Sequence, residues 1–386
     1  MRPAVLFIGS LPPPVHGASL TNELVVRTLS DRFRFLVLDT SEKRGIHLVG
    51  RVGKLILDRH KISTTLRSLV GFIRIASRER PSLVYLTPSA SPVGALRDFA
   101  FLLLSRSAGI PVLLYLHQGG WGRLAGAWPW PVRAAFRVLA RGVRIAVVAT
   151  ERQLEGMDRM FPASMARVVP HGLPDLPEPP RRKENPPPKV LFVSNLREEK
   201  GYHLLLKAIP LVHAEMPEVE FHFVGPSESE TEQTRTAGLM RQIERQAQVV
   251  HHGFLEGESK DRVYADAWVF ALPTLVPETG PLVVLEAMRA GLPVVTTDRA
   301  SYVVDGATGI VLREVDERTL ARSVVETLRD GARRGRMGIA GRKRFEEAHT
   351  LGRFAEGIAS AITEALTQDD RPPTRRESLR RPSEEG

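Results

Sequence analysis

The sequence predicts an α/β protein with two parallel-sheet domains, and three observations support this fold class. Short apolar runs alternate with helical stretches in two successive sets, which is typical of the strand–helix–strand units of parallel sheets. Residues 174–188 separate the two sets and contain seven prolines, so this segment cannot be a helix or a central strand. The length of 386 residues also favours two hydrophobic cores, since one domain contains roughly 100 to 200 residues.

The apolar runs divide the chain into an N-terminal and a C-terminal domain. The first domain spans residues 1–173, and its strands are expected at residues 4–9, 35–38, 83–86, 112–116 and 144–149. The second domain spans residues 189–345, and its strands are expected at residues 190–194, 220–224, 268–272 and 293–296. Parallel sheets bind ligands at the carboxyl ends of their strands, so the functional site is expected in the crevice between the two domains.

The end of the chain is expected to contain a helix and a tail. Residues 346–368 are expected to form a helix that packs back on the first domain, whereas residues 369–386 have too few apolar side chains to fold.

No apolar run approaches the roughly 18 residues that span a bilayer, and the first run is too short for a signal peptide. The chain has no cysteine, which excludes disulfide bonds, thiolate zinc sites and a cysteine nucleophile. These features predict a cytoplasmic protein.

Positive charge is concentrated in the first half of the chain. Residues 1–177 contain 24 lysines and arginines against 11 acidic residues, whereas the rest of the chain is slightly acidic. Residues 43–80 contain ten of these basic residues interleaved with leucine and isoleucine, and residues 121–130 add three tryptophans. Two interpretations remain open: a solvated helix face with an ordinary aromatic core, or a surface that contacts anionic lipid or an anionic acceptor. The second interpretation makes the protein peripheral on the inner face of the membrane.

The segment PETGPLVVLEAMRAGLPVV, residues 277–295, carries the strongest chemical signal. Its loop holds Glu278, Pro281 suits the first turn of the helix that follows, and Glu286 lies inside that helix. A carboxylate accepts hydrogen bonds from pairs of hydroxyls, so the two glutamates are candidate ligands of a sugar and of a ribose. The alternative is an ordinary amphipathic helix whose glutamates face water.

The first turn of the same helix offers a candidate anion site. The backbone amides of Leu282 and Val283 have no partner within the helix, and the helix dipole favours an anion beside them. Along the chain, the Glu278 carboxylate comes first, the two free amides follow and the Glu286 carboxylate comes last. This order matches the order of sugar, diphosphate and ribose in a nucleoside diphosphate sugar.

These residues resemble the signature of a known family. Two glutamates separated by seven residues and followed by AMRAGLPVV are similar to the E-x7-E signature of family 4 retaining glycosyltransferases, which have the GT-B fold of two Rossmann-like domains. Further segments are similar to the family in the same order and cover most of residues 189–312: SNLREEKGYHLLLKAI, FHFVGPS, HHGFL, YADAWVFALPT and DGATGIVL. The resemblance implies that the second domain binds a nucleoside diphosphate sugar as donor substrate and that the first domain presents an acceptor hydroxyl.

The resemblance also implies a reaction and its partners. The sugar is expected to be transferred with retention of its anomeric configuration, in polysaccharide, lipid-linked glycan or glycolipid biosynthesis. The acceptor is expected to be a glycan, a lipid-linked molecule or a small molecule. Neither the donor base nor the sugar can be identified from the sequence.

The resemblance assigns roles to residues of the second domain. Lys200 corresponds to a lysine that offsets the charge of the leaving diphosphate, and Glu278 corresponds to a catalytic group that holds the donor sugar. Glu286 corresponds to the ribose ligand. Asn195 stands where the family usually has arginine, so this donor-binding position lacks a positive charge. Two interpretations remain open: phosphate binding is weaker, or Arg197 assists it. Without the resemblance, Lys200 would be interpreted as a surface lysine that opens a helix.

Residues of the first domain receive roles in the same way. Gly17 follows the first strand and resembles the glycine loop that lets the backbone approach the donor, although a tight turn is the alternative. His117 ends a strand beside two glycines, where the family often carries a catalytic histidine that contacts the donor sugar. The alternative for His117 is a structural role. The stretch PHGL with His171 resembles a family segment but is given no chemistry.

Other kinds of site are not indicated by the sequence. It contains no P-loop, no Asp-x-Asp motif and no cluster with metal-ligand spacing, so neither a metal ion nor another cofactor is expected. Two alternatives to a glycosyltransferase remain. The same fold serves sugar-nucleotide epimerases, and positive charge alone suggests a nucleic-acid-binding module. No nucleic acid partner is expected for a glycosyltransferase.

Overall fold

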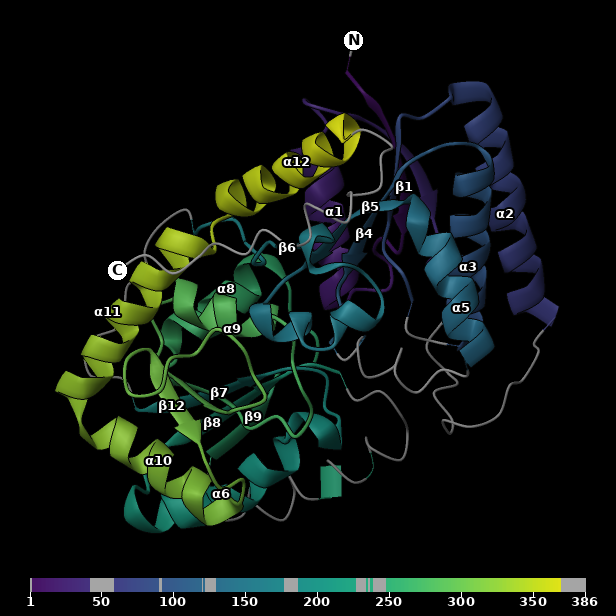
Figure 1. The fold of residues 1–386 in the computed structure, drawn as a ribbon. Coiled ribbons are helices and arrows are strands. Elements are labelled where there is room, and N and C mark those ends of the chain that lie inside the picture. Colours follow the sequence, from purple (N-terminus) through teal and green to yellow (C-terminus); the bar gives the residue numbers. More distant parts are fainter. Residues whose placement is uncertain are drawn as a thin grey trace.

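The computed structural model describes residues 2–41, 59–89, 92–119, 121, 130–176, 187–226, 234, 237–238 and 248–368. Within these residues the chain forms two six-stranded sheets in which all neighbouring strands are parallel, with helices packed against them (Figure 1). The predicted α/β fold with two parallel sheets is confirmed. Several predicted features lie outside the described residues: most of the segment 174–188, the tail 369–386, and residues 43–58 and 122–129 of the basic and aromatic segments.

The first sheet has the strand order β2-β1-β3-β4-β5-β6. Its strands are β1 (Ala4–Gly9), β2 (Arg34–Asp39), β3 (Leu83–Leu86), β4 (Val112–Leu116), β5 (Val143–Val148) and β6 (Ala166–Val168). The helices of this half are α1 (Gly17–Thr28), α2 (Arg59–Glu79), α3 (Pro92–Ser107) and α5 (Trp130–Leu139). The five predicted strands are found within one residue of their expected bounds. Strand β6 was not predicted, because three residues at a sheet edge are too short to show an apolar pattern.

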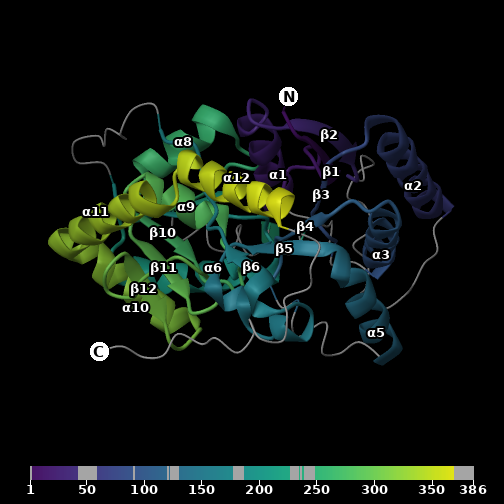
Figure 2. The ribbon, with the colours of Figure 1, turned by 45° about the horizontal axis from the view of Figure 1, so that its top comes forward.

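Side chains that alternate along the central strands form one core on each face of this sheet. Leu6 and Ile8 of β1 face the core beneath α2, α3 and α5, whereas Val5 and Phe7 face the core beneath α1 and α12 (Leu351–Thr367). Helices α2, α3 and α5 therefore form one layer. This layer lies at the right of Figures 1 and 2, away from α10 and α11 of the second half.

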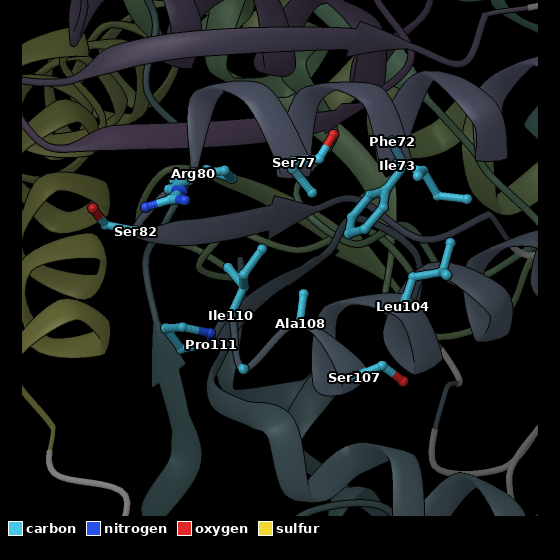
Figure 3. A pocket seen from close by; sticks show the side chains of 13 residues that line it. Phe72, Ile73, Ser77, Arg80, Ser82, Leu104, Ser107, Ala108, Ile110 and Pro111 are labelled. Atoms are coloured by element: carbon cyan, nitrogen blue, oxygen red, sulfur yellow. The ribbon is translucent and has the colours of Figure 1, made fainter.

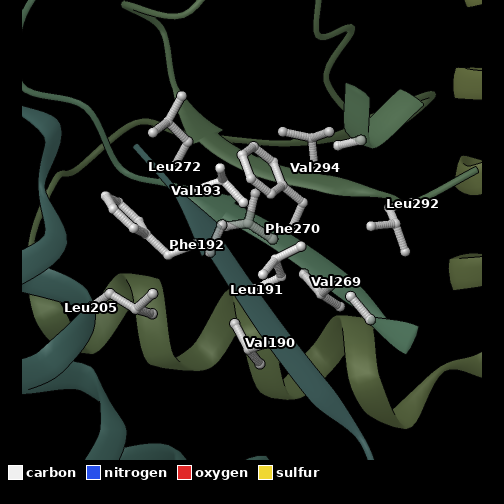
Figure 4. Close-up of a cluster of buried hydrophobic side chains, with 14 of the residues drawn as sticks. Val190, Leu191, Phe192, Val193, Leu205, Val269, Phe270, Leu272, Leu292 and Val294 are labelled. Atoms are coloured by element: carbon white, nitrogen blue, oxygen red, sulfur yellow. The ribbon is translucent and has the colours of Figure 1, made fainter. Parts of the chain in front are cut away.

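The second sheet has the strand order β12-β11-β10-β7-β8-β9. Its strands are β7 (Lys189–Val193), β8 (Glu220–Val224), β9 (Gln248–His251), β10 (Val269–Leu272), β11 (Val294–Thr297) and β12 (Gly309–Leu312). Its helices are α6 (Tyr202–Glu215), α8 (Gly257–Asp266), α9 (Leu282–Arg289), α10 (Glu317–Arg329) and α11 (Gly331–Ala348). Apolar side chains of the central strands are buried against these helices (Figure 4). Strands β9 and β12 were not predicted, because each forms an edge of the sheet and is only four residues long.

The chain crosses between the two halves twice, and the crossing segments are hydrogen-bonded to each other. Leu173 donates its amide to the carbonyl of His349 at 3.0 Å and accepts a hydrogen bond from the amide of Leu351 at 2.8 Å. Helix α12 then packs on the first sheet, where Phe354 and Ile358 are fully buried. The last described helix thus completes a core whose strands lie more than 200 residues earlier in the chain.

The C-terminal helical region is divided into two helices at residues 349–350. Helix α11 ends at Ala348, and Thr350 caps α12 by accepting a hydrogen bond from the amide of Arg353 at 3.4 Å. Residues 346–348, which the sequence analysis places in the terminal helix, therefore belong to α11. None of the helices in the described part of the chain is both long and apolar enough to cross a membrane.

Candidate active site

Three loops at the carboxyl edge of the second sheet pack directly against one another. Gly201 has a φ of 79°, and a Cβ added to it would lie 2.0 Å from the carbonyl oxygen of Pro273. Gly225 has a φ of 134°, and a Cβ there would lie 1.9 Å from the carbonyl oxygen of Ser194. Only glycine fits both positions. The loops that follow β7, β8 and β10 are thereby brought close enough for their charged side chains to meet.

The first pair of predicted residues to meet is Lys200 and Glu278. The Lys200 ammonium contacts the Glu278 carboxylate, and their side chains are only 22% and 15% exposed. The hydroxyl of Thr274 lies 3.2 Å from the same carboxylate oxygen. The Glu278 backbone is also fixed, because its amide donates to the carbonyl of Arg299 at 2.8 Å and its carbonyl accepts from the hydroxyl of Ser301 at 3.0 Å. One cation and one carboxylate are therefore held together at this edge of the sheet.

The N-terminus of α9 lies next to this pair in the chain. The carbonyl of Pro281 accepts hydrogen bonds from the amides of Val284 and Leu285, at 3.0 and 3.5 Å. The amides of Leu282 and Val283 find no hydrogen-bond partner among the residues that the structure describes. Pro281 is the residue before the helix, not part of its first turn as the sequence suggested. Proline has no backbone N–H to donate. Because Pro281 lies before the helix, the first turn of α9 still offers the amides of Leu282 and Val283 to an anion.

Glu286 is held by two donors on the neighbouring helix α8. Its carboxylate accepts hydrogen bonds from the Lys260 ammonium at 2.7 Å and from the Tyr264 hydroxyl at 2.8 Å. Burial and the nearby carboxylate raise the pKa of Tyr264 well above its ordinary value, so this phenol remains a donor. Neither donor is predicted from the sequence. Their spacing of four residues, which places them on one face of α8, is the signal that could have indicated them.

His117 of the first half reaches the same region. Asn22 donates its amide group to the carbonyl of Ser10 at 2.9 Å, so its carboxamide oxygen is the atom that lies 2.7 Å from His117 Nε2. His117 Nε2 must therefore donate, and Nδ1 is left as a buried acceptor without a partner in the described structure. Burial, with smaller contributions from two other histidines, lowers the pKa of His117 well below its ordinary value. The ring is neutral near pH 7.

Thr279 connects His117 to the loop that holds Glu278. The Thr279 hydroxyl donates to the carbonyl oxygen of His117 at 2.8 Å, so the two halves of the molecule are hydrogen-bonded at the candidate site. Neither Asn22 nor Thr279 is given a role by the sequence. Their roles depend on contacts between segments that are 95 and 162 residues apart.

His171 lies at the same boundary between the two halves. Its Nδ1 is 2.8 Å from the carbonyl of Gly280, and its amide donates to the hydroxyl of Tyr302 at 3.2 Å. Its Nε2 is buried without a hydrogen-bond partner among the described residues. Burial lowers the pKa of His171 to about 4. The sequence analysis gave His171 no chemistry, and the structure shows it as a neutral side chain that joins the first half to the loop before α9.

The depressed pKa of His171 predicts a pH-dependent stability. The unfolded chain binds a proton at this histidine below about pH 6.5, whereas the folded chain binds it only near pH 4. The contribution of His171 to stability is therefore complete above pH 6.5 and is lost as the pH falls toward 4, by about 3 kcal/mol in total. Denaturant unfolding at pH 7.5 and at pH 5 should show this loss, and His171→Asn should reduce the pH slope. An unchanged slope in the variant would contradict the assignment.

The remaining predicted residues lie nearby but are less constrained. Gly17 opens α1, and a Cβ added to it would meet nothing within 4 Å, so the protein itself does not require glycine there. Asn195 follows β7, and its carbonyl accepts a hydrogen bond from the amide of Arg197 at 2.8 Å. The Arg197 guanidinium is paired with Glu199 at 2.7 Å. Its charge is thus already engaged where the sequence analysis expected it to assist phosphate binding.

A family comparison matches the half of the chain that contains this constellation. Residues 178–344 match the family described as "Glycosyl transferases group 1". This matched region, called the group 1 domain below for its similarity to that family, contains Lys200, Glu278, Glu286 and both α9 amides, whereas His117 lies outside it.

Two curated relatives each match less than half of the chain. One relative is a GDP-mannose-dependent monoacylated alpha-(1-6)-phosphatidylinositol monomannoside mannosyltransferase of Corynebacterium glutamicum. The two sequences are 33% identical over 167 residues, and this match covers 41% of this chain and 42% of that protein. It is 28% identical over 182 residues to spore coat protein SA of Bacillus subtilis, covering 44% and 47% of the two chains. The chain thus spans less than half the length of these relatives.

A comparison of structures extends beyond the group 1 domain. The structure of Anabaena Alr3699/HepE in complex with UDP and glucose superposes with a TM-score of 0.69 at 16% identity, over 94% of this chain and 100% of that chain. At this identity the likeness concerns the fold alone. The expected GT-B arrangement of two parallel-sheet domains is confirmed by it.

Proposed function

We propose that the chain is a glycosyltransferase that moves a sugar from a nucleoside diphosphate sugar to an acceptor hydroxyl, with retention of the anomeric configuration. The observation that carries the proposal is the contact between Lys200 and Glu278 in a group 1 domain, beside the unpartnered amides that open α9. This constellation combines a cation for a diphosphate with a carboxylate for sugar hydroxyls. The proposed setting is polysaccharide, lipid-linked glycan or glycolipid biosynthesis, and the acceptor is a glycan, a lipid-linked molecule or a small molecule.

The diphosphate of the donor is proposed to compete with Glu278 for Lys200. Without a donor, the Lys200 ammonium neutralises this carboxylate. A diphosphate bound at Lys200 and at the amides of Leu282 and Val283 would release the Glu278 carboxylate to accept hydrogen bonds from sugar hydroxyls. Diphosphate binding and sugar recognition would then be coupled in one site. Lys200 and the amides supply the positive potential, so the proposal requires no metal ion or other cofactor.

The first half is proposed to present the acceptor and to close the site. His117 has an orientation fixed by Asn22 and offers the unpartnered Nδ1 acceptor, which suits it to accept a hydrogen bond from a donor-sugar hydroxyl. The hydrogen bond between Thr279 and the carbonyl of His117 keeps the two sides together. A closed crevice excludes water, which would otherwise hydrolyse the donor.

The proposed ligand positions predict distinct effects on nucleotide binding. Glu286→Ala removes the ribose acceptor, and Lys200→Ala removes the phosphate cation, so each should weaken a free nucleoside diphosphate about tenfold or more, since a charged hydrogen bond contributes about 1.5 to 3 kcal/mol. Only Lys200→Ala should also lower turnover strongly, because the leaving-group charge grows in the transition state. Calorimetry and product assays measure the two effects. Unchanged affinity in both variants would refute these positions.

The donor base is tested first, because the relatives differ in it. The mannosyltransferase relative is GDP-mannose-dependent, and the structural neighbour binds UDP and glucose. A thermal-shift panel of nucleoside diphosphates would identify the base, and the matching sugar nucleotides would then be incubated with candidate acceptors. Nucleoside diphosphate release together with a glycosylated acceptor supports the proposal. A rearranged sugar nucleotide without transfer would indicate an epimerase instead.

A further inference from the structure

The layer formed by α2, α3 and α5 carries an unusual share of exposed apolar side chains. Of the fifteen large apolar residues that are exposed in the described part of the chain, seven lie on these three helices: Leu66, Val70, Ile73, Leu96, Leu103, Trp130 and Val138. They repeat at helical spacings of three, four, seven or eight residues, so each helix presents them on one side. Their inner sides pack on the sheet, and their outer sides face away from the second half (Figures 1 and 2).

Helix α2 combines an apolar row with a row of arginines. Its apolar row consists of Leu66, Val70 and Ile73, which are 53 to 64% exposed. Because successive residues of a helix are about 100° apart, three exposed arginines fall in a second row directly beside it: Arg67, Arg74 and Arg78. The apolar row and the cations therefore face the same surroundings.

Negative charge is almost absent from this layer. The sequences of α2, α3 and α5 contain nine lysines and arginines but only two acidic residues. Asp98 is buried and paired with Arg97 at 2.9 Å, and Glu79 is paired with Arg34 at 2.9 Å. Both carboxylates are thus neutralised within the protein. An anionic partner would meet cations and apolar side chains without an unpaired carboxylate.

A hollow continues the apolar row of α2 toward the end of α3. It has a volume of about 660 Å³ and is lined by Phe72 and Ile73 of α2 and by Leu104 of α3, with Ile110 at its floor (Figure 3). Arg80 lies at one end of it. The hollow therefore extends the apolar surface to the ends of α2 and α3, at the amino edge of the sheet.

The geometry points to this layer, defined by the outer faces of α2, α3 and α5, as a docking surface for an anionic lipid bilayer. Apolar side chains enter the interfacial region of a bilayer while neighbouring arginines remain at the level of the lipid phosphates. Each helix follows a parallel strand and so begins at the carboxyl edge of the sheet, where the candidate site opens. Trp130 is the first residue of α5 and Leu96 is the fifth residue of α3, so both lie near the starts of their helices. Docking in this way would bring the crevice next to the bilayer.

The inference goes beyond the proposed transferase activity, and its test requires no turnover. Co-sedimentation would compare vesicles of phosphatidylglycerol with vesicles of phosphatidylcholine, at low and at high salt. The parent chain should bind the anionic vesicles and lose binding at high salt. Replacement of Arg67, Arg74 and Arg78 by glutamate should weaken binding at least about 100-fold, since each basic residue near the surface contributes about fivefold.

Two further variants separate this surface from general charge and from self-association. Replacement of Leu66, Val70 and Ile73 by glutamine keeps the charge and should also abolish stable binding. In the control variant, the exposed Arg318, Arg322 and Arg336 of the second half are replaced by glutamate. This makes the same charge change as the replacement of the three α2 arginines and should leave vesicle binding unaffected. Equal loss in this control, or no binding of the parent to anionic vesicles at low salt, would overturn the inference. A parent dimer that the glutamine variant dissociates would show that a second copy covers the surface instead.

Discussion

Replacing Glu278 with glutamine is expected to lower the rate of sugar transfer at least about tenfold. The substitution keeps the size of the side chain but removes the charge that would strengthen hydrogen bonds to the donor sugar, a difference of about 1.5 to 3 kcal/mol. The affinity for free nucleoside diphosphate should not fall, because the variant frees Lys200 from its carboxylate partner. Steady-state turnover and calorimetry of the same preparation would measure both quantities.

A matched control for this experiment is Glu258→Gln. Glu258 lies on α8 of the same half and its side chain is 91% exposed, so the loss of its charge should affect neither turnover nor affinity. Equal turnover in Glu278→Gln and the parent chain would remove Glu278 from the proposed reaction. A fall in nucleotide affinity would place its carboxylate beside the ribose or the base, not the sugar.

Truncation of Phe354 to alanine is expected to destabilise the first half strongly. The Phe354 ring is 1% exposed and belongs to the core that α12 forms with β1, β3, β4 and β5. A buried phenylalanine truncated to alanine typically costs about 3 to 5 kcal/mol, because it loses its burial and leaves a cavity. Urea unfolding should therefore show an earlier transition for Phe354→Ala. A chain that ends at residue 349 should lose this core altogether and aggregate.

The control for this prediction lies on the outer side of the same helix. Glu356 forms an ion pair with Arg32 in which both side chains are more than half exposed, so Glu356→Ala should change stability little. If Phe354→Ala is as stable as Glu356→Ala, α12 does not contribute the core contacts described above. Circular dichroism at low denaturant would show whether each variant remains folded.

The parallel-sheet fold was predictable because buried strands are continuous apolar runs. Strand β4, with the sequence VLLYL, is buried at every position and cannot be mistaken for an amphipathic helix turn. Edge strands have no such signal. Strand β12 is only partly buried and follows a turn, and β9 begins and ends with polar residues, so local sequence does not distinguish them from loops.

The sequence offers candidate residues for the site but not the contacts between them. The spacing around Glu278 and Glu286 indicates a donor site, and the resemblance adds Lys200. The contact between Lys200 and Glu278 joins positions 78 residues apart, and no local pattern records it. The same holds for Asn22, whose contact with His117 depends on how β4 and α1 meet in the first half. Pairings of this kind are set by tertiary packing.

The paired crossings at Leu173 and at His349 to Leu351 make the second half of the molecule an insertion within the first half. Residues 174–349 leave the first half and return to it at two adjacent, hydrogen-bonded points, much as an inserted domain does. A chimera that takes its second half from a relative would therefore need both residues 1–173 and residues 350–368 from this chain. Under the proposed function, exchange at these two junctions changes the sugar nucleotide while the proposed acceptor side stays intact.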